Sequence, residues 1–270
     1  CLVDVDESYF QMLFEKLNLE YKTVVEERKI PIYNELLKAY LANDLEYIEK
    51  CNNRVIESNS YSDTEIEIIL ILHNILTGAY EEVEKSIDRM DTIRNTLTSE
   101  ELMFLGFLKI VFYKESCQYD IMCEEIDLIL NNVPKEELLY FALLDIALDF
   151  YYWTFSKTKF METLNEFKQS KYLRYLKKGE LRHHFQKLLF LSTEEFKVAE
   201  VIEDEFQLIK DTLSSEDMPM YFYYYALHLT HKRKYEQAYL ILNDLEKTSP
   251  IMALMGYLAD KMYLLNYQER

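Results

Sequence analysis

A pair of helical segments recurs along the chain at intervals of 35 to 40 residues. The second segment of each pair opens with a similar short pattern, as in Tyr235-Glu236-Gln237-Ala238. Equivalent positions in these openings are Ile48, Val83, Cys123, Thr163, Ala199 and Ala238, so subtraction gives steps of 35, 40, 40, 36 and 39 residues. A period of this size is typical of arrays in which one small helical unit is stacked on the next. The pattern therefore predicts an all-α chain of about six helical hairpins.

The clearest unit runs from Met218 to Pro250. Its first helix carries Ala226, a short polar break follows, and its second helix starts near Ala238. Small residues thus stand where the two helices touch, and a proline closes the unit. This arrangement resembles a tetratricopeptide repeat, whose units are typically about 34 residues long. The resemblance implies a right-handed α-solenoid with a capping helix at its C-terminal end.

Turn-forming residues are scarce, with only four Gly and four Pro among 270 residues. Such scarcity favours helices joined by short connections over a meander of strands. Hydrophobic residues make up 49% of the chain, which supplies ample material for a core. We therefore expect a folded helical protein and not a disordered one.

Local signals place several helix ends. Either Ser62 or the residue after it can cap a helix, and Thr98 with Glu101 forms a capping box. Pro134 predicts a further helix start, because proline suits the first helical turn. Gly78 stands where a helix should end and predicts a glycine C-cap.

Three regions follow from these patterns. Residues 1–28 are expected to form an N-terminal helix or the remnant of a linker, since the chain begins with Cys and not Met. Residues 29–250 are expected to form the repeat domain. Residues 251–270 show apolar residues at helical spacing, which predicts a helix that either caps the last repeat or forms a dimer contact.

Charge and cysteine usage restrict the partners. The formal net charge is -18, because 48 acids outnumber 30 bases, and such a field repels phosphate backbones and anionic lipid. The longest apolar stretch has about seven residues, whereas a membrane-spanning helix needs about 20. The four cysteines form no CxxC pair, and no export signal precedes them. We therefore expect a cytoplasmic protein that binds neither membrane nor, through this segment, DNA.

Catalytic and metal-binding patterns are weak. Each of the four glycines stands alone, so no phosphate-binding glycine loop is present. Glu180 and His183 have the Glu-x-x-His spacing of di-iron bundles, but no second copy occurs. His228 and His231 share a helix face without a third ligand nearby. No cysteine lies in a protease signature, and Cys51, Cys117 and Cys123 are interpreted as small apolar residues. We expect no enzyme, cofactor or metal site.

Aromatic residues are in excess, with 23 Tyr and 15 Phe, and five are consecutive at 221–225. Successive helical residues differ by about 100°, so these five cannot all face the core. One interpretation packs Phe222 and Tyr225 between hairpins and leaves the others at the rim. The other places Tyr223 and Tyr152 in a concave groove that holds a peptide. The polar residues Asn34, Asn74 and His231, also predicted on first helices, complete this candidate groove, because an amide can bond both peptide groups of a ligand.

The acidic, tyrosine-rich array is similar to the C-terminal regulatory region of cytoplasmic peptide-pheromone receptors of Gram-positive bacteria, the Rap, Rgg, NprR and PlcR group. The resemblance implies a domain that binds a short signalling peptide in its concave groove and acts as a homodimer. It also implies control of DNA through an N-terminal helix-turn-helix, which this chain lacks. The alternative is a constitutive protein–protein adaptor of the helical-repeat type.

Overall fold

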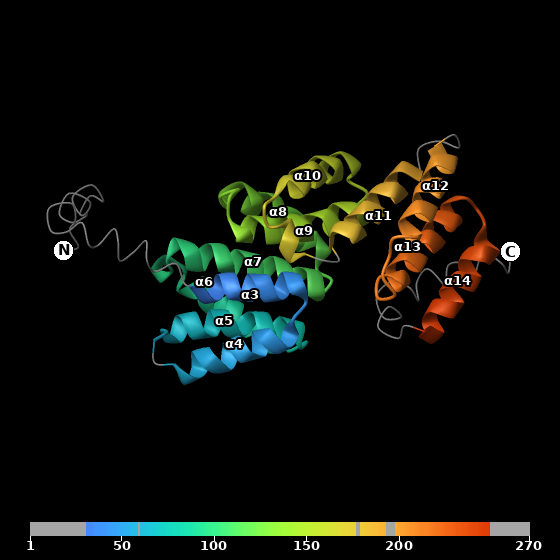
Figure 1. The fold of residues 1–270 in the computed structure, drawn as a ribbon. Helices are drawn as coiled ribbons and strands as arrows, with labels where there is room; N and C mark the ends of the chain where they lie inside the picture. The colour runs from blue at the N-terminus through green and yellow to red at the C-terminus, as the bar shows by residue number, and fades with distance from the viewer. Residues whose placement is uncertain (1–30, 59, 177–178, 193–197, 249–270) are drawn as a thin grey trace, which may run out of the picture. The chain divides into compact units, whose positions relative to one another are not determined.

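The computed structural model describes residues 31–58, 60–176, 179–192 and 198–248. Every regular element in these ranges is a helix, which confirms the predicted all-α class (Figure 1). The predicted N-terminal region 1–28, Pro250 and the predicted helix at 251–270 lie outside the described residues.

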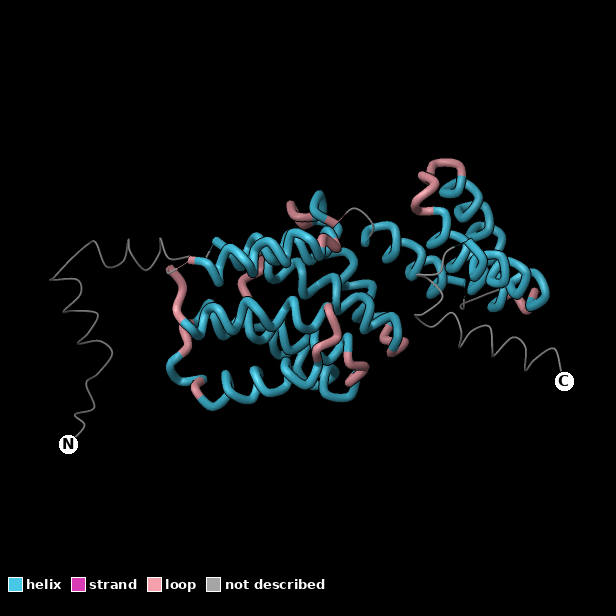
Figure 2. The backbone as a smooth tube through the Cα atoms, turned by 90° about the horizontal axis from the view of Figure 1, so that it is seen from below, coloured by secondary structure: helices cyan, strands magenta, loops and turns pink. Residues whose placement is uncertain are grey.

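The helices follow one another along the chain in consecutive pairs. They are α3 (Pro31–Ala42), α4 (Leu45–Glu57), α5 (Asp63–Leu76), α6 (Tyr80–Thr92), α7 (Ser99–Glu115), α8 (Tyr119–Asn132), α9 (Leu138–Trp153), α10 (Lys157–Gln169), α11 (Gly179–Ser192), α12 (Val198–Lys210), α13 (Met218–His231) and α14 (Tyr235–Thr248), with short 3-10 helices η1 (Arg94–Thr96) and η2 (Leu173–Tyr175). Short connections join neighbouring helices (Figure 2).

The chain divides into two compact units between Leu143 and Leu144, within α9. In the first unit, α5 packs against α4, α6 and α7, and α7 also packs against α6 and α8. Its core contains stacked aromatic rings: Tyr33 of α3 lies 4.2 Å from Phe104 of α7, measured between ring centroids. This stacking brings α3 and α7 together although they are far apart in the sequence.

In the second unit, α11 packs against α10, α12 and α13, and α13 pairs with α14. Phe185 of α11 and Phe206 of α12 stack in parallel with ring centroids 5.6 Å apart. Tyr221 of α13 meets both rings edge-on and is almost fully buried. Aromatic burial therefore joins three successive helices around one core.

The five hairpin turns that the structure describes share one backbone geometry. After α5, the N–H of Gly78 bonds to Ile75 O at 3.1 Å and that of Ala79 bonds to Asn74 O at 2.8 Å. This pair of bonds is a Schellman motif, and it requires positive φ at the first of the two donors. The same pattern recurs with positive φ at four non-glycine residues, Asn43, Cys117, Phe155 and Arg233. A repeated turn thus makes the hairpins alike despite their divergent sequences.

The helix-end predictions have mixed outcomes. Ser62 and Thr98 cap α5 and α7 with complete capping boxes, and Gly78 has the predicted φ of 80°. The start predicted at Pro134 is wrong, because residues 134–137 form a turn and α9 begins at Leu138. A continuous run of buried side chains begins at Leu138, so tertiary packing and not proline selects the start of this helix.

The run of five aromatics packs differently from the first interpretation. Tyr221, Tyr223 and Tyr224 are buried, whereas Phe222 and Tyr225 are only half-buried. Three residues of this run face the core because α13 has neighbours on several sides, namely α11, α12 and α14. The expectation that Tyr221 and Tyr224 lie at the rim is therefore wrong.

Candidate functional sites

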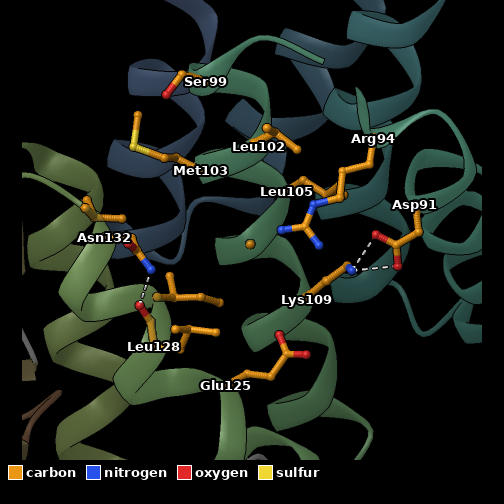
Figure 3. Close-up of a pocket in the computed structure, with 13 residues that line it drawn as sticks. Asp91, Arg94, Ser99, Leu102, Met103, Leu105, Lys109, Glu125, Leu128 and Asn132 are labelled. Carbon is orange, nitrogen blue, oxygen red and sulfur yellow. Dashed lines mark hydrogen bonds and ion pairs between the residues drawn. The ribbon is translucent and has the colours of Figure 1, made fainter. Parts of the chain in front are cut away.

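A cavity of about 520 Å³ lies in the first unit and is lined by the end of α6, η1, α7 and α8 (Figure 3). Its volume falls in the range of about 300–1,000 Å³ that is typical of small-ligand sites. The apolar part of the wall comes from Leu102, Met103, Leu105, Ile129 and Val133. We call this cavity the α7–α8 pocket.

A glycine in the middle of a helix lines the pocket. Gly106 lies inside α7, where glycine costs about 1 kcal/mol relative to alanine. The three atoms nearest to a Cβ built at this position all belong to the side chain of Ile129, the closest at 3.4 Å. Backbone packing therefore does not require glycine here, whereas a larger side chain would occupy the pocket.

Charged side chains surround the apolar wall. Lys109 Nζ lies 2.7 Å from each carboxylate oxygen of Asp91, so this cation is already paired. Arg94 is exposed and extends its guanidinium over the pocket (Figure 3). Glu125 of α8 lies at the opposite edge. The pocket thus combines an apolar surface with one cation and one anion that make no ion pair with any described residue.

A second cluster lies in the second unit and joins α9 to α11. Arg182 Nη2 lies 2.8 Å from Asp145 Oδ1, and its Nε lies 3.0 Å from Asp149 Oδ1. Burial disfavours the charge on Arg182, but Asp149 and Asp145 outweigh it and raise the pKa of the guanidinium. Both aspartates are largely buried, with side-chain exposures of 8% and 13%. The three charges therefore hold the two helices together.

His183 and Gln186 extend this polar network. Gln186 Nε2 lies 2.9 Å from Asp149 Oδ1, and because a carboxylate only accepts, the amide nitrogen must face it. Gln186 Oε1 lies 2.8 Å from His183 Nδ1, and His183 Nε2 lies 2.7 Å from Asp145 Oδ1. The ring of His183 therefore links Gln186 to Asp145 through both of its nitrogens. Gln186 also lies 3.4 Å from the hydroxyl of Tyr224, which adds α13 to the network.

A third cluster is centred on Glu203 of α12. Its carboxylate accepts from Lys232 at 2.7 Å, from Tyr225 and from His228 Nε2 at 3.3 Å, all three donors being on or just after α13. Burial raises the pKa of Glu203, but these donors outweigh it and lower the value to about 2. Burial, with help from Lys232, lowers the pKa of His228 to about 4. The three donors on Glu203 stabilise the α12–α13 contact, whereas His228 Nδ1 is buried and has no hydrogen-bond partner among the described residues.

None of the five groove residues expected from the sequence lines the α7–α8 pocket. Asn34 and Asn74 are half-buried on α3 and α5 of the first unit. In the second unit, Tyr152 packs its ring 5.4 Å from Phe190, and Tyr223 is 8% exposed. His231 lies with its Nδ1 2.9 Å from Ser192 Oγ, so it links α13 to α11.

Sequence reasoning missed the pocket because its lining residues are spread from 91 to 133 over three helices and η1. One available signal was Gly106, which stands alone inside an apolar helical stretch and has no turn to make. An isolated glycine in such a position points to a packing or functional reason.

The other candidate features have simple outcomes. Within the described ranges, no three His, Cys, Asp or Glu side chains gather as a metal site. Over the same ranges, no helix combines the length and apolarity needed to cross a membrane. Cys51 is buried as expected for a small apolar residue, but Cys117 and Cys123 are exposed, so that expectation is wrong for them.

Comparisons with protein-family models, curated proteins and solved structures found no match.

Proposed function

We propose that this chain is a peptide-binding module of the helical-repeat type. The single observation that carries the proposal is the α7–α8 pocket, in which an apolar wall adjoins a cation and an anion that form no ion pair within the described ranges. A short peptide presents the matching groups, namely apolar side chains beside charges and backbone polar groups. The mid-helix Gly106 supports the proposal, because it keeps the pocket open at a cost in helix stability.

We further propose the sensory role that the resemblance implies. In it, the six hairpins form a right-handed α-solenoid in the cytoplasm, and a short signalling peptide shifts the orientation of neighbouring hairpins. The pocket lies between α6 and α8 over α7, so a bound peptide would contact two consecutive hairpins. Small rotations between repeats add up in a solenoid and would reposition a homodimer partner or an attached DNA-binding domain.

Isothermal titration against pools of synthetic hexapeptides tests the binding role. We expect binding to the native chain and a loss of at least about tenfold in Gly106→Leu, whose side chain fills the pocket. Gly106→Ala is the matched control, because its methyl group fits beside Ile129 and the pocket stays open. Equal binding by the Leu variant would show that peptides do not bind in the pocket. An absence of binding by any pool would refute the peptide-binding role.

A constitutive adaptor is the second candidate, and a specific surface favours it. Trp153 and Phe155, at the α9–α10 turn, are 53% and 80% exposed, and we call them the turn aromatics. Phe155 also has a φ of 54°, which costs energy in a residue other than glycine. Exposed aromatics are typical hot spots of protein interfaces.

The emission of Trp153, the only tryptophan of the chain, distinguishes the two functions. An adaptor that uses the turn aromatics should show a blue shift of Trp153 emission with a folded partner and weaker capture of that partner by Phe155→Ser. Capture that is unchanged in Phe155→Ser but lost in Gly106→Leu would show that the partner binds at the α7–α8 pocket.

A further inference from the structure

We propose that the α7–α8 pocket recognises the C-terminal residue of its peptide, with the α-carboxylate bound by Arg94 and an apolar side chain against the wall. The inference rests on the proposed peptide-binding function and adds which end of the peptide is bound. It follows from the distribution of charge around the pocket.

Arg94 is the cation available for a ligand anion. The other cation that lines the pocket, Lys109, is held by both oxygens of Asp91 at 2.7 Å. Arg94 has no ion pair with a described residue, although acids outnumber bases by 48 to 30 in the chain. Its guanidinium extends over the pocket toward the apolar wall (Figure 3). A guanidinium binds a carboxylate through two parallel hydrogen bonds, and no acidic side chain in the described part of the chain forms such a pair with Arg94.

The apolar wall lies directly beside this cation. Leu102 and Leu105 of α7 and Ile129 and Val133 of α8 all line the pocket, and Ile129 lies against Gly106. The side-chain amide nitrogen of Asn132 is already used within α8, because Nδ2 donates to Leu128 O at 2.8 Å. A ligand that places a carboxylate on Arg94 therefore has its next few atoms against apolar side chains.

An α-carboxylate fits this arrangement better than the acid of an Asp or Glu side chain. In a C-terminal residue, the carboxylate and the apolar side chain branch from the same Cα, so one residue satisfies both the cation and the wall. Internal acids would add negative charge to a ligand of a chain whose own net charge is -18. Glu125 at the opposite edge would accept a peptide N–H and would repel an acid at the penultimate position.

A double-mutant cycle tests the proposal. The probes are hexapeptides that end in Leu, made as the free acid and as the C-terminal amide, and titrated against the native chain and Arg94→Gln. We expect amidation to weaken binding by about 10- to 100-fold in the native chain and to have no effect in Arg94→Gln. The matched control is Arg89→Gln, which removes an exposed arginine of α6 that pairs with Glu67 and does not line the pocket.

The outcomes separate this inference from the proposed function. Acid and amide that bind the native chain equally would overturn the C-terminal recognition and leave peptide binding intact. Free leucine that binds as tightly as the hexapeptide would assign the site to an amino acid, which overturns the peptide as ligand. A fall in affinity on amidation that persists in Arg94→Gln would assign the carboxylate to another cation and overturn the role of Arg94. Far-UV circular dichroism shows whether each variant is folded.

Discussion

The repeated hairpin turn makes a quantitative prediction at Gly78. Its φ of 80° lies in the left-handed region, and a Cβ built there meets nothing within 4 Å. Gly78→Ala therefore adds backbone strain without a steric clash. A left-handed conformation costs an ordinary residue about 1–2 kcal/mol, and the loss of glycine's unfolded-state entropy offsets about 0.4–1 kcal/mol of it. We expect a net loss of about 1 kcal/mol.

Urea unfolding followed by circular dichroism measures this loss, and hydrogen exchange at the amides of α5 and α6 assigns it to their hairpin. Gly78→Asn should lose less, because asparagine tolerates positive φ. The reverse change, Arg233→Gly at φ 58°, should stabilise the second unit by up to about 1 kcal/mol. A Gly78→Ala variant as stable as the native chain would refute the strain argument, and equal losses in the Ala and Asn variants would assign the effect to something other than φ.

Three further predictions concern the polar clusters and the pocket. His228 is protonated below about pH 6.5 in the unfolded chain but only below about pH 4 in the folded chain. The free energy of unfolding should therefore fall by roughly 3 kcal/mol as the pH falls across this interval. Urea titrations should show that His228→Gln removes this part of the pH dependence. The lowered pKa of Glu203 stabilises the fold above about pH 4.5, and this contribution should disappear as the pH falls toward 2. Glu203→Gln should abolish this part of the pH dependence. Gly106→Ala should raise the stability of the chain by about 0.5–1 kcal/mol, measured by thermal unfolding, because its methyl group fits beside Ile129 at 3.4 Å, and a variant no more stable than the native chain would contradict this fit.

Local sequence signals predicted the hairpins because their causes are local. Apolar residues at helical spacing, the capping boxes at Ser62 and Thr98 and the glycine at 78 each act within a few residues. The start of α9 was mispredicted because Pro134 is compatible with a first helical turn but does not require one. The positive φ at Cys117, Phe155 and Arg233 had no sequence signal, since glycine is the usual marker.

The sequence by itself determined the helical class, the hairpin period and the acidic character of the chain, since these depend on composition and on spacing within one helix. Only the tertiary structure decided which polar residues meet. Asp145 and His183 are 38 positions apart, and no spacing rule joins them, yet their side chains bond at 2.7 Å. Likewise the α7–α8 pocket needs the end of α6, η1 and two further helices at once. A period fixes how often helices recur, whereas packing fixes which faces of different helices meet and so where charge and apolar surface come together.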